Sequence, residues 1–147
     1  MLSVYFSATG ADISPVQIAL ERSNVPDAIF LLADIAEVEF PNESFGAVSA
    51  FYSIIPVPRG LQPSLLEKIT SGRFIGTFHA GDSAEDYNPD WLRVPMPWSG
   101  YGIEDNQLVI EAAGLRIIRA KNETTQSDVD WGPTTFHWIV AEKVQQT

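Results

Sequence analysis

The chain turns from a short apolar strand into a helix within a few residues, and this turn constrains the fold more than any other stretch. Residues 7–14 read Ser-Ala-Thr-Gly-Ala-Asp-Ile-Ser, so the predicted strand ends on one carboxylate, Asp12. Ser14 is a suitable N-cap, Pro15 suits the first helical position, and Gln17 can complete a capping box. A strand that runs straight into a helix is half of a βαβ unit. Ligands of open parallel sheets bind beyond the carboxyl ends of the strands, so Asp12 is a candidate ligand residue.

Strands and helices alternate along most of the remaining chain. The pattern predicts strands over Leu2–Asp12, Ile29–Ala33 (buried on both faces), Ala47–Ile55, Arg73–His79, Leu115–Lys121 and Thr134–Lys143. It predicts helices over Pro15–Ser23, over Gln62–Thr70 with Leu65, Leu66 and Ile69 inward, and over Ile103–Ala113 with Leu108, Val109 and Ala112 inward. No helix separates the last two strands, so we expect an antiparallel hairpin there. Between residues 81 and 101 the periodicity is weak, and we expect a long loop.

Composition limits the class of protein. A chain of 147 residues is long enough for one core, so we expect a single domain over 1–147. The net charge of −10 disfavours nucleic acid as a partner, because phosphates would be repelled. No apolar run reaches the roughly 20 residues of a membrane span, so we expect no membrane partner. The absence of cysteine fits a cytoplasmic protein, and two histidines without ligand spacing predict no metal site.

The element order resembles that of class I S-adenosylmethionine-dependent methyltransferases. Four segments carry the resemblance: Thr9–Ser14 is similar to the end of the family's second strand, Leu31–Ile35 to the end of its third, Glu43–Val48 to its acidic fourth-strand motif, and Glu111–Leu115 to its late helix-to-strand turn. The resemblance implies an α/β fold, a three-layer Rossmann-like sandwich. Its sheet would be mainly parallel, with an antiparallel C-terminal hairpin.

The resemblance also implies roles for particular residues. Asp12, with Ile13, would bind the ribose hydroxyls of S-adenosylmethionine, because a carboxylate can accept from both. Asp34 would accept from the adenine amino group, with Ile35 beside the ring. The remaining implied site residues are aromatic or apolar: Phe51 and Tyr52 near the methyl group, and a substrate lid over Trp91–Tyr101 that includes Trp91, Met96, Trp98 and Tyr101.

The chain departs from the family pattern in three places. The chain has no counterpart of the family's first strand, of the glycine-rich loop after it or of the helix that follows. Gly46 stands where the fourth-strand motif usually has Asp. Pro56 stands where close relatives often carry His. The missing strand lies centrally in the family's sheet, so its loss would leave two strand edges unpaired. The gap could close in three ways. The flanking strands could pair directly, Leu2–Phe6 could fold into the vacant place, or a second chain could supply a strand or cover the edge. We expect closure together with a homodimer.

Two interpretations of these residues remain open. Asp12 and Asp34 are either ligand residues or turn and capping acids. His79 is a candidate general base and Tyr52 a second catalytic candidate, while His79 has a structural alternative. The aromatic residues of 91–101 line either a pocket or a packed interface. The chain is accordingly either a methyltransferase acting on a small molecule or a non-catalytic, dimeric binding or scaffold protein of the same fold.

Overall fold

The computed structural model describes residues 6–69, 72–81, 83–91, 94–125 and 133–144, and only the backbone of 83–91 and 94. The chain divides into two compact units, residues 1–39 and 40–147. Each unit has a sheet of its own, and unit 2 has a further two-stranded sheet. The units are therefore described separately.

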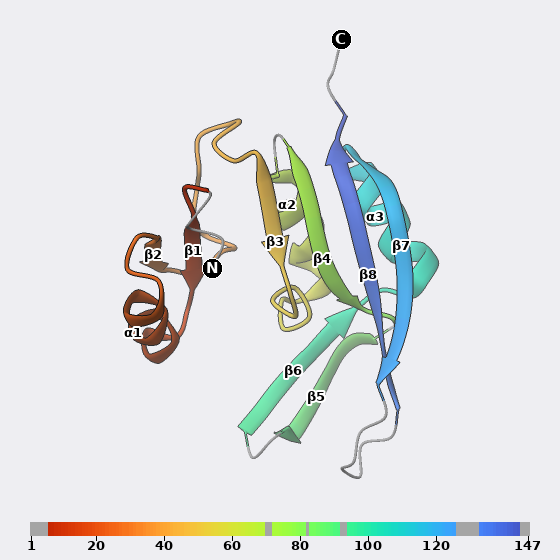
Figure 1. Ribbon diagram of the computed structural model, residues 1–147. Coiled ribbons are helices and arrows are strands. Elements are labelled where there is room, and N and C mark those ends of the chain that lie inside the picture. Colours follow the sequence, from red (N-terminus) through yellow and green to blue (C-terminus); the bar gives the residue numbers. More distant parts are fainter. Residues whose placement is uncertain (1–5, 70–71, 82, 92–93, 126–132, 145–147) are drawn as a thin grey trace. The chain divides into compact units, whose positions relative to one another are not determined.

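Unit 1 is a single βαβ element (Figure 1). It consists of β1 (Thr9–Asp12), α1 (Pro15–Asn24) and β2 (Ile29–Leu32), with β1 and β2 parallel. The predicted N-cap is confirmed, because the Ser14 Oγ accepts from the Gln17 N–H at 3.3 Å. Residues 2–5 of the predicted first strand lie outside the described part, and the strand itself begins only at Thr9.

The prediction that β2 is buried on both faces is wrong. Ile29 and Leu32 expose 59% and 55% of their surface. One helix covers only one face of a two-stranded sheet, so the other face has no cover from the described residues of unit 1. Ile18 is the buried apolar residue of α1.

The main sheet of unit 2 has four strands in the order β3-β4-β8-β7 (Figure 1). The strands are β3 (Ala47–Ala50), β4 (Arg73–His79), β7 (Leu115–Thr125) and β8 (Thr134–Lys143). β3 is parallel to β4, whereas β8 is antiparallel to both β4 and β7. The predicted C-terminal hairpin is confirmed. Among the described residues, β1 pairs with β2 inside unit 1 and β3 pairs with β4 inside unit 2.

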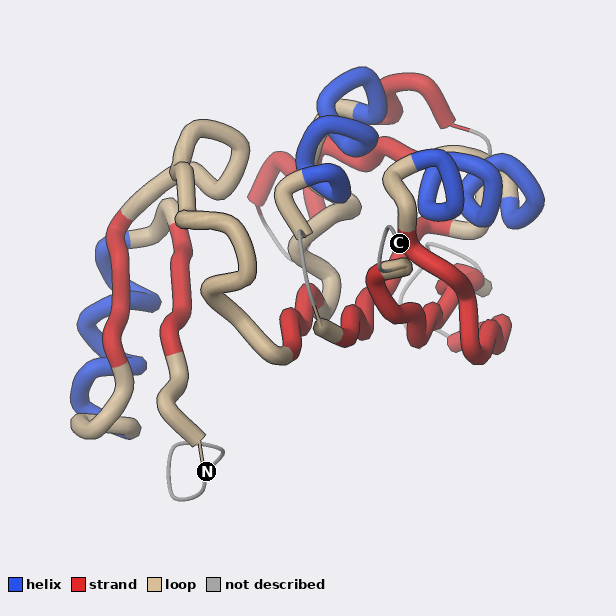
Figure 2. The backbone as a smooth tube through the Cα atoms, turned by 90° about the horizontal axis from the view of Figure 1, so that it is seen from above, coloured by secondary structure: helices blue, strands red, loops and turns tan. Residues whose placement is uncertain are grey.

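Two helices cover one face of this sheet. They are α2 (Gln62–Glu67), which follows the short 3₁₀ turn η2 (Arg59–Leu61), and α3 (Ile103–Ala112), and Figure 2 shows both on the same side of the strands. The core between helices and sheet consists of buried apolar residues: Ile54, Leu66, Ile69, Phe74, Phe78, Ile110, Ala113, Leu115, Ile139 and Ala141. Among the described residues of unit 2, no helix lies on the opposite face of the sheet.

The inward face of α3 differs from the prediction. Asn106 and Ile110 are buried and Ala113 follows them, whereas Leu108 is 62% exposed and Ala112 is exposed. The Asn106 amide donates to the carbonyls of His79 and Tyr101 at 2.8 and 3.0 Å. A buried polar residue thus fixes the helix rotation, which an apolar pattern alone misassigns.

Residues 83–91 and 94–100 form two paired strands and not the predicted loop. β5 (Ser83–Trp91) and β6 (Val94–Gly100) pair antiparallel with interruptions in register. Pro95 and Pro97 lie two positions apart, so their missing N–H groups fall on one side of β6. Proline is tolerated there because a strand in a two-stranded sheet has one unpaired side.

β3 is shorter than predicted because the chain turns sharply after Ala50. Tyr52 has a φ of 57°, which ends the extended conformation, and Ile54 and Ile55 are buried in the turn that follows. Helix α2 likewise ends at Glu67 and not at Thr70. Gly72 has a φ of 76°, and a Cβ there would clash with the Gly46 carbonyl oxygen, so this turn requires glycine.

The assignment of the α3 face can be tested with two truncations on the same helix. Ile110→Ala should lower the free energy of unfolding by about 2–5 kcal/mol, because Ile110 is fully buried. Leu108→Ala, on the exposed face, should change it by about 0.5 kcal/mol or less. Urea unfolding followed by circular dichroism measures both, and equal losses would contradict the assignment.

His137 lies buried at the centre of a polar network. Its Nδ1 is 2.5 Å from the Asn122 Oδ1 and its Nε2 is 3.4 Å from the Gln107 Nε2. A carbonyl oxygen can only accept, so Nδ1 carries the proton and Nε2 accepts from the Gln107 amide. The ring is therefore neutral, and burial lowers the pKa of His137 below its ordinary value.

The lowered pKa of His137 predicts a loss of stability in mild acid. The unfolded chain binds the proton more readily, so the free energy of unfolding should fall as the pH drops below about 6.5 toward the folded-state pKa. Urea unfolding from pH 8 to pH 5 measures the slope. His137→Gln should remove the part of the slope due to this residue, and an unchanged slope would contradict the prediction.

Candidate functional site

The two predicted carboxylates of unit 1 follow neighbouring parallel strands. Asp12 is the last residue of β1, and Asp34 lies two residues beyond the end of β2. The register pairs Asp12 with Leu32, and the Ala33 N–H donates to the Asp12 carbonyl at 3.0 Å. Both acids therefore lie at the carboxyl end of the same small sheet, as predicted.

Each carboxylate also holds its own turn. The Asp12 Oδ1 accepts from the Ser14 N–H at 2.7 Å, and the Asp34 Oδ1 accepts from the Ala36 N–H at 2.8 Å. The turn role that the sequence left open is thus real. Both carboxylates can still accept further hydrogen bonds, because both are exposed and an ionised carboxylate has two oxygens with several lone pairs. Of the two isoleucines next to these acids, Ile13 is 71% exposed and Ile35 is half-buried.

Unit 2 gathers aromatic side chains where β3 ends. The Tyr52 ring stands edge-on to Phe136 at 5.1 Å and to Trp138 at 5.9 Å between ring centroids. Phe51 lies 5.6 Å from Trp138. Phe51 and Tyr52 each remain 47% exposed, so the cluster presents two ring surfaces to solvent. The positive φ of Tyr52 is a strained conformation of the kind that concentrates at functional sites.

His79 ends β4 beside this cluster. Its ring packs edge-on against Trp98 at 5.5 Å, and Trp98 in turn stacks on Phe136 at 6.2 Å. The His79 Nδ1 is buried and has no hydrogen-bond partner among the described residues. A Cβ on Gly81 would approach this ring to 2.8 Å, so Gly81 is required for its close packing. His79 is half-buried with one ring nitrogen enclosed, whereas Tyr52 is 47% exposed, so Tyr52 is the more accessible of the two catalytic candidates.

The remaining predicted substrate residues have structural contacts. The Tyr101 hydroxyl donates to the Arg59 carbonyl at 3.0 Å, and the Arg59 guanidinium lies 5.4 Å from the Tyr101 ring. Met96 packs against a small cluster of Ile55, Trp98 and Phe136. The side chain of Trp91 lies outside the described part. The structure thus connects Met96 and Trp98 to the aromatic cluster but places Tyr101 in a separate contact.

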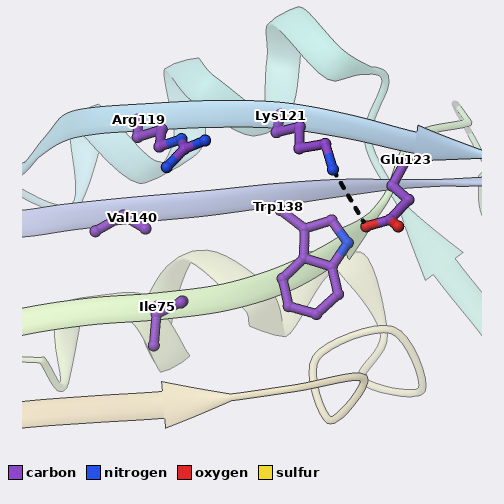
Figure 3. Close-up of a pocket in the computed structure, with 6 residues that line it drawn as sticks. All are labelled: Ile75, Arg119, Lys121, Glu123, Trp138 and Val140. Carbon is purple, nitrogen blue, oxygen red and sulfur yellow. Dashed lines mark ion pairs between the residues drawn. The ribbon is translucent and has the colours of Figure 1, made fainter.

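A shallow groove crosses the sheet face opposite to α2 and α3 (Figure 3). It has a volume of about 250 Å³ and is lined by Ile75, Arg119, Lys121, Glu123, Trp138 and Val140. Lys121 and Glu123 form an exposed ion pair at 3.8 Å. Trp138 belongs to both the groove and the aromatic cluster, so the two are continuous.

This groove is not among the features predicted from the sequence, although the sequence of β8 contains a signal for it. Trp138 and Val140 alternate with the core residues Ile139 and Ala141, so one strand carries apolar side chains on both faces. Such a strand requires either a second covering layer or an exposed apolar surface. The groove is that exposed surface.

The described residues contain no group of three or more His, Asp or Glu side chains that could hold a metal ion. Among the same residues, no helix is long and apolar enough to cross a membrane.

Several solved structures are similar to this chain. An S-adenosylmethionine-dependent methyltransferase of Methanosarcina mazei superposes with a TM-score of 0.76 and 13% identity, over 98% of this chain and 85% of that one. The 1,6-didemethyltoxoflavin-N1-methyltransferase of Burkholderia thailandensis, solved with S-adenosylhomocysteine, gives 0.61 and 12%, over 93% and 61%. The (4+2)-cyclase SpnF gives 0.66 and 15%, over 99% and 70%.

The chain therefore has the Rossmann-like α/β fold of class I S-adenosylmethionine-dependent methyltransferases, which confirms the predicted fold class. No known family profile and no curated protein sequence matches it. The similarity at these identities is one of fold.

The strain at Tyr52 predicts an unusual order of stability among its variants. Tyr52→Gly should unfold with a free energy about 1 kcal/mol higher than Tyr52→Ala, because glycine adopts a φ of 57° without steric cost. At Phe51, which has no positive φ, the order should be reversed. Urea unfolding of the four variants tests this, and the same order at both positions would contradict it.

Proposed function

We propose that this chain binds S-adenosylmethionine and transfers its methyl group to a small molecule. The observation that carries the proposal is the pair of exposed carboxylates, Asp12 and Asp34, at the carboxyl ends of two adjacent parallel strands in a methyltransferase fold. Ligands of open parallel sheets bind at these ends. A neighbour of the same fold was solved with S-adenosylhomocysteine, the demethylated cofactor.

The acids of unit 1 suit the nucleoside part of the cofactor. Each uses one carboxylate oxygen for a turn amide, which leaves the other free to accept from ribose hydroxyls or from an adenine amino group. The turn bonds also fix the orientation of the carboxylates before a ligand binds. We assign Asp12 and Ile13 to the ribose, and Asp34 and Ile35 to the adenine.

The aromatic cluster of unit 2 suits the acceptor. Phe51 and Tyr52 expose ring surface, and Trp98 and Met96 pack behind them against Phe136. We assign Phe51 to the methyl-donating end of the cofactor and Tyr52, Met96 and Trp98 to the substrate. Trp91 and Tyr101 complete the proposed substrate set.

The bound cofactor would supply a methyl group already activated by its sulfonium, so the chain's own task is to hold the acceptor in line. Tyr52 is placed to orient an acceptor, because its ring is fixed by two edge-on contacts and still faces solvent. His79 is the second candidate, as a general base. We further propose a homodimer and a cytoplasmic location, the latter from the absence of cysteine.

Titration calorimetry with S-adenosylmethionine and S-adenosylhomocysteine tests the cofactor assignment. Wild type should bind at micromolar strength. Asp12→Ala and Asp34→Ala should each weaken binding by about tenfold or more, since each loses a charged hydrogen-bond acceptor worth about 1.5–3 kcal/mol. Asp27→Ala is the matched control, because Asp27 is exposed and precedes β2 at its opposite end.

No heat at millimolar ligand would overturn the proposal and leave the non-catalytic alternative. Equal weakening by all three variants would overturn the residue assignment while leaving cofactor binding intact. Circular dichroism on each variant shows that the fold is retained, which is required because Asp12 and Asp34 also hold turns.

A further inference from the structure

A buried glutamine ties an irregular segment of unit 2 to helix α2. Gln62, the first residue of α2, is 1% exposed. Its side-chain amide lies 2.9 Å from the Val57 carbonyl and 3.3 Å from the carbonyls of Ile54 and Ser99. Carbonyl oxygens can only accept, so the nitrogen of the amide faces them and donates. Gln62 therefore connects residues 54–57 and strand β6 to one point on α2.

Further hydrogen bonds hold the same segment. The Ile54 carbonyl also accepts from the Val57 N–H at 2.9 Å, and the Ile55 carbonyl accepts from the Ser99 N–H at 2.9 Å. The Ser99 hydroxyl accepts from the Arg59 N–H at 2.7 Å. The segment lies between β3 and η2, where the chain is described throughout and forms no regular helix or strand. Its buried backbone groups depend on such bonds, all of which come from within unit 2.

The segment directly follows the strained turn that carries Tyr52. The φ of Tyr52 is 57°, a conformation that persists only where the surroundings of the residue impose it. On one side of the turn, Ala50 is fixed by its pairing with β4. On the other side, the Ile54 carbonyl is fixed by Gln62. The turn of residues 51–53 is thus held between two anchored points.

We propose that Gln62 is a positioning residue of the acceptor site, which holds the Tyr52 ring in place through the backbone of this segment. The inference rests on the proposed function for the role of Tyr52. The ring lies 5.1 Å from Phe136 and 5.9 Å from Trp138 and is 47% exposed, so its position depends on the backbone that carries it. Gln62 is too deeply buried to touch an acceptor. It fixes the site before the acceptor binds, which lowers the entropy lost on binding.

NMR of the full chain labelled with ¹³C-tyrosine, without cofactor, follows the position of the Tyr52 ring. Tyr52→Phe identifies the Tyr52 signals. In the wild type, the ring currents of Phe136 and Trp138 should displace these signals from the positions of free tyrosine. Gln62→Met keeps the length of the side chain but cannot donate, so the displacement should fall by about half or more.

Gln107→Met is the matched control, because Gln107 is a half-buried glutamine of α3 whose amide bonds to His137 and not to the segment. It should leave the Tyr52 signals in place. Gln62→Glu is the second variant, which gives the answer even if Gln62→Met does not fold. Burial and the facing carbonyls should raise the pKa of the new carboxyl, so lowering the pH from 8.5 to 6 adds a proton. The neutral carboxyl has one donor, and the displacement should then return toward its wild-type value.

Tyr52 signals that keep their displacement in both Gln62 variants, or that lose it equally in Gln107→Met, would overturn the positioning role. Calorimetry of the wild type with S-adenosylhomocysteine separates this result from the proposed function. Binding together with unmoved Tyr52 signals would remove the role of Gln62 alone. No binding together with displaced signals would overturn the methyl-transfer proposal and support Gln62 as the residue that positions the turn. Circular dichroism confirms that each variant is folded.

Discussion

The packing of β4 determines most of unit 2. Phe74 and Phe78 stand 6.1 Å apart on the helix-covered face, with Gly76 between them on the same face. A Cβ on Gly76 would approach the Phe74 ring to 2.3 Å, so only glycine allows the ring to lie there. β4 also has a parallel neighbour on one side and an antiparallel neighbour on the other. Its phenylalanines pack against Ile110 of α3, its backbone pairs with β3, and its last residue is His79. These contacts position α3, β3 and His79 relative to β4.

Unit 1 obeys a different constraint, because it has little core of its own. Ile18 is buried, whereas Val16, Leu20, Ile29 and Leu32 are each more than half exposed. Two strands and one helix cannot bury enough apolar surface to be independently stable. Local bonds compensate in part: the cap at Ser14 and the two aspartate turns satisfy backbone groups that packing leaves open. The proposed ligand residues are thus also the residues that hold this unit's turns.

The sequence predicts α1, β4 and β8 closely, because capping residues or a continuous apolar run mark them. It fails where a single side chain overrides the pattern. Asn106 turns α3 away from the face that Leu108 suggests, and the φ of Tyr52 ends β3 before Ile54. The hairpin of β5 and β6 is hidden by its prolines, which normally argue against strands. The acids of unit 1 are predictable from strand ends, whereas the aromatic cluster depends on β8, which is distant in sequence.

The fold by itself does not determine the reaction, since SpnF, a cyclase, shares it. The choice among reactions therefore depends on what the side chains can do. His79 is half-buried and packs against Trp98 and Gly81, and its buried Nδ1 is not accessible for proton transfer. Tyr52 instead presents a fixed and accessible ring. The proposed methyl transfer from an activated donor fits this arrangement, because that reaction needs a positioned acceptor more than it needs a proton acceptor.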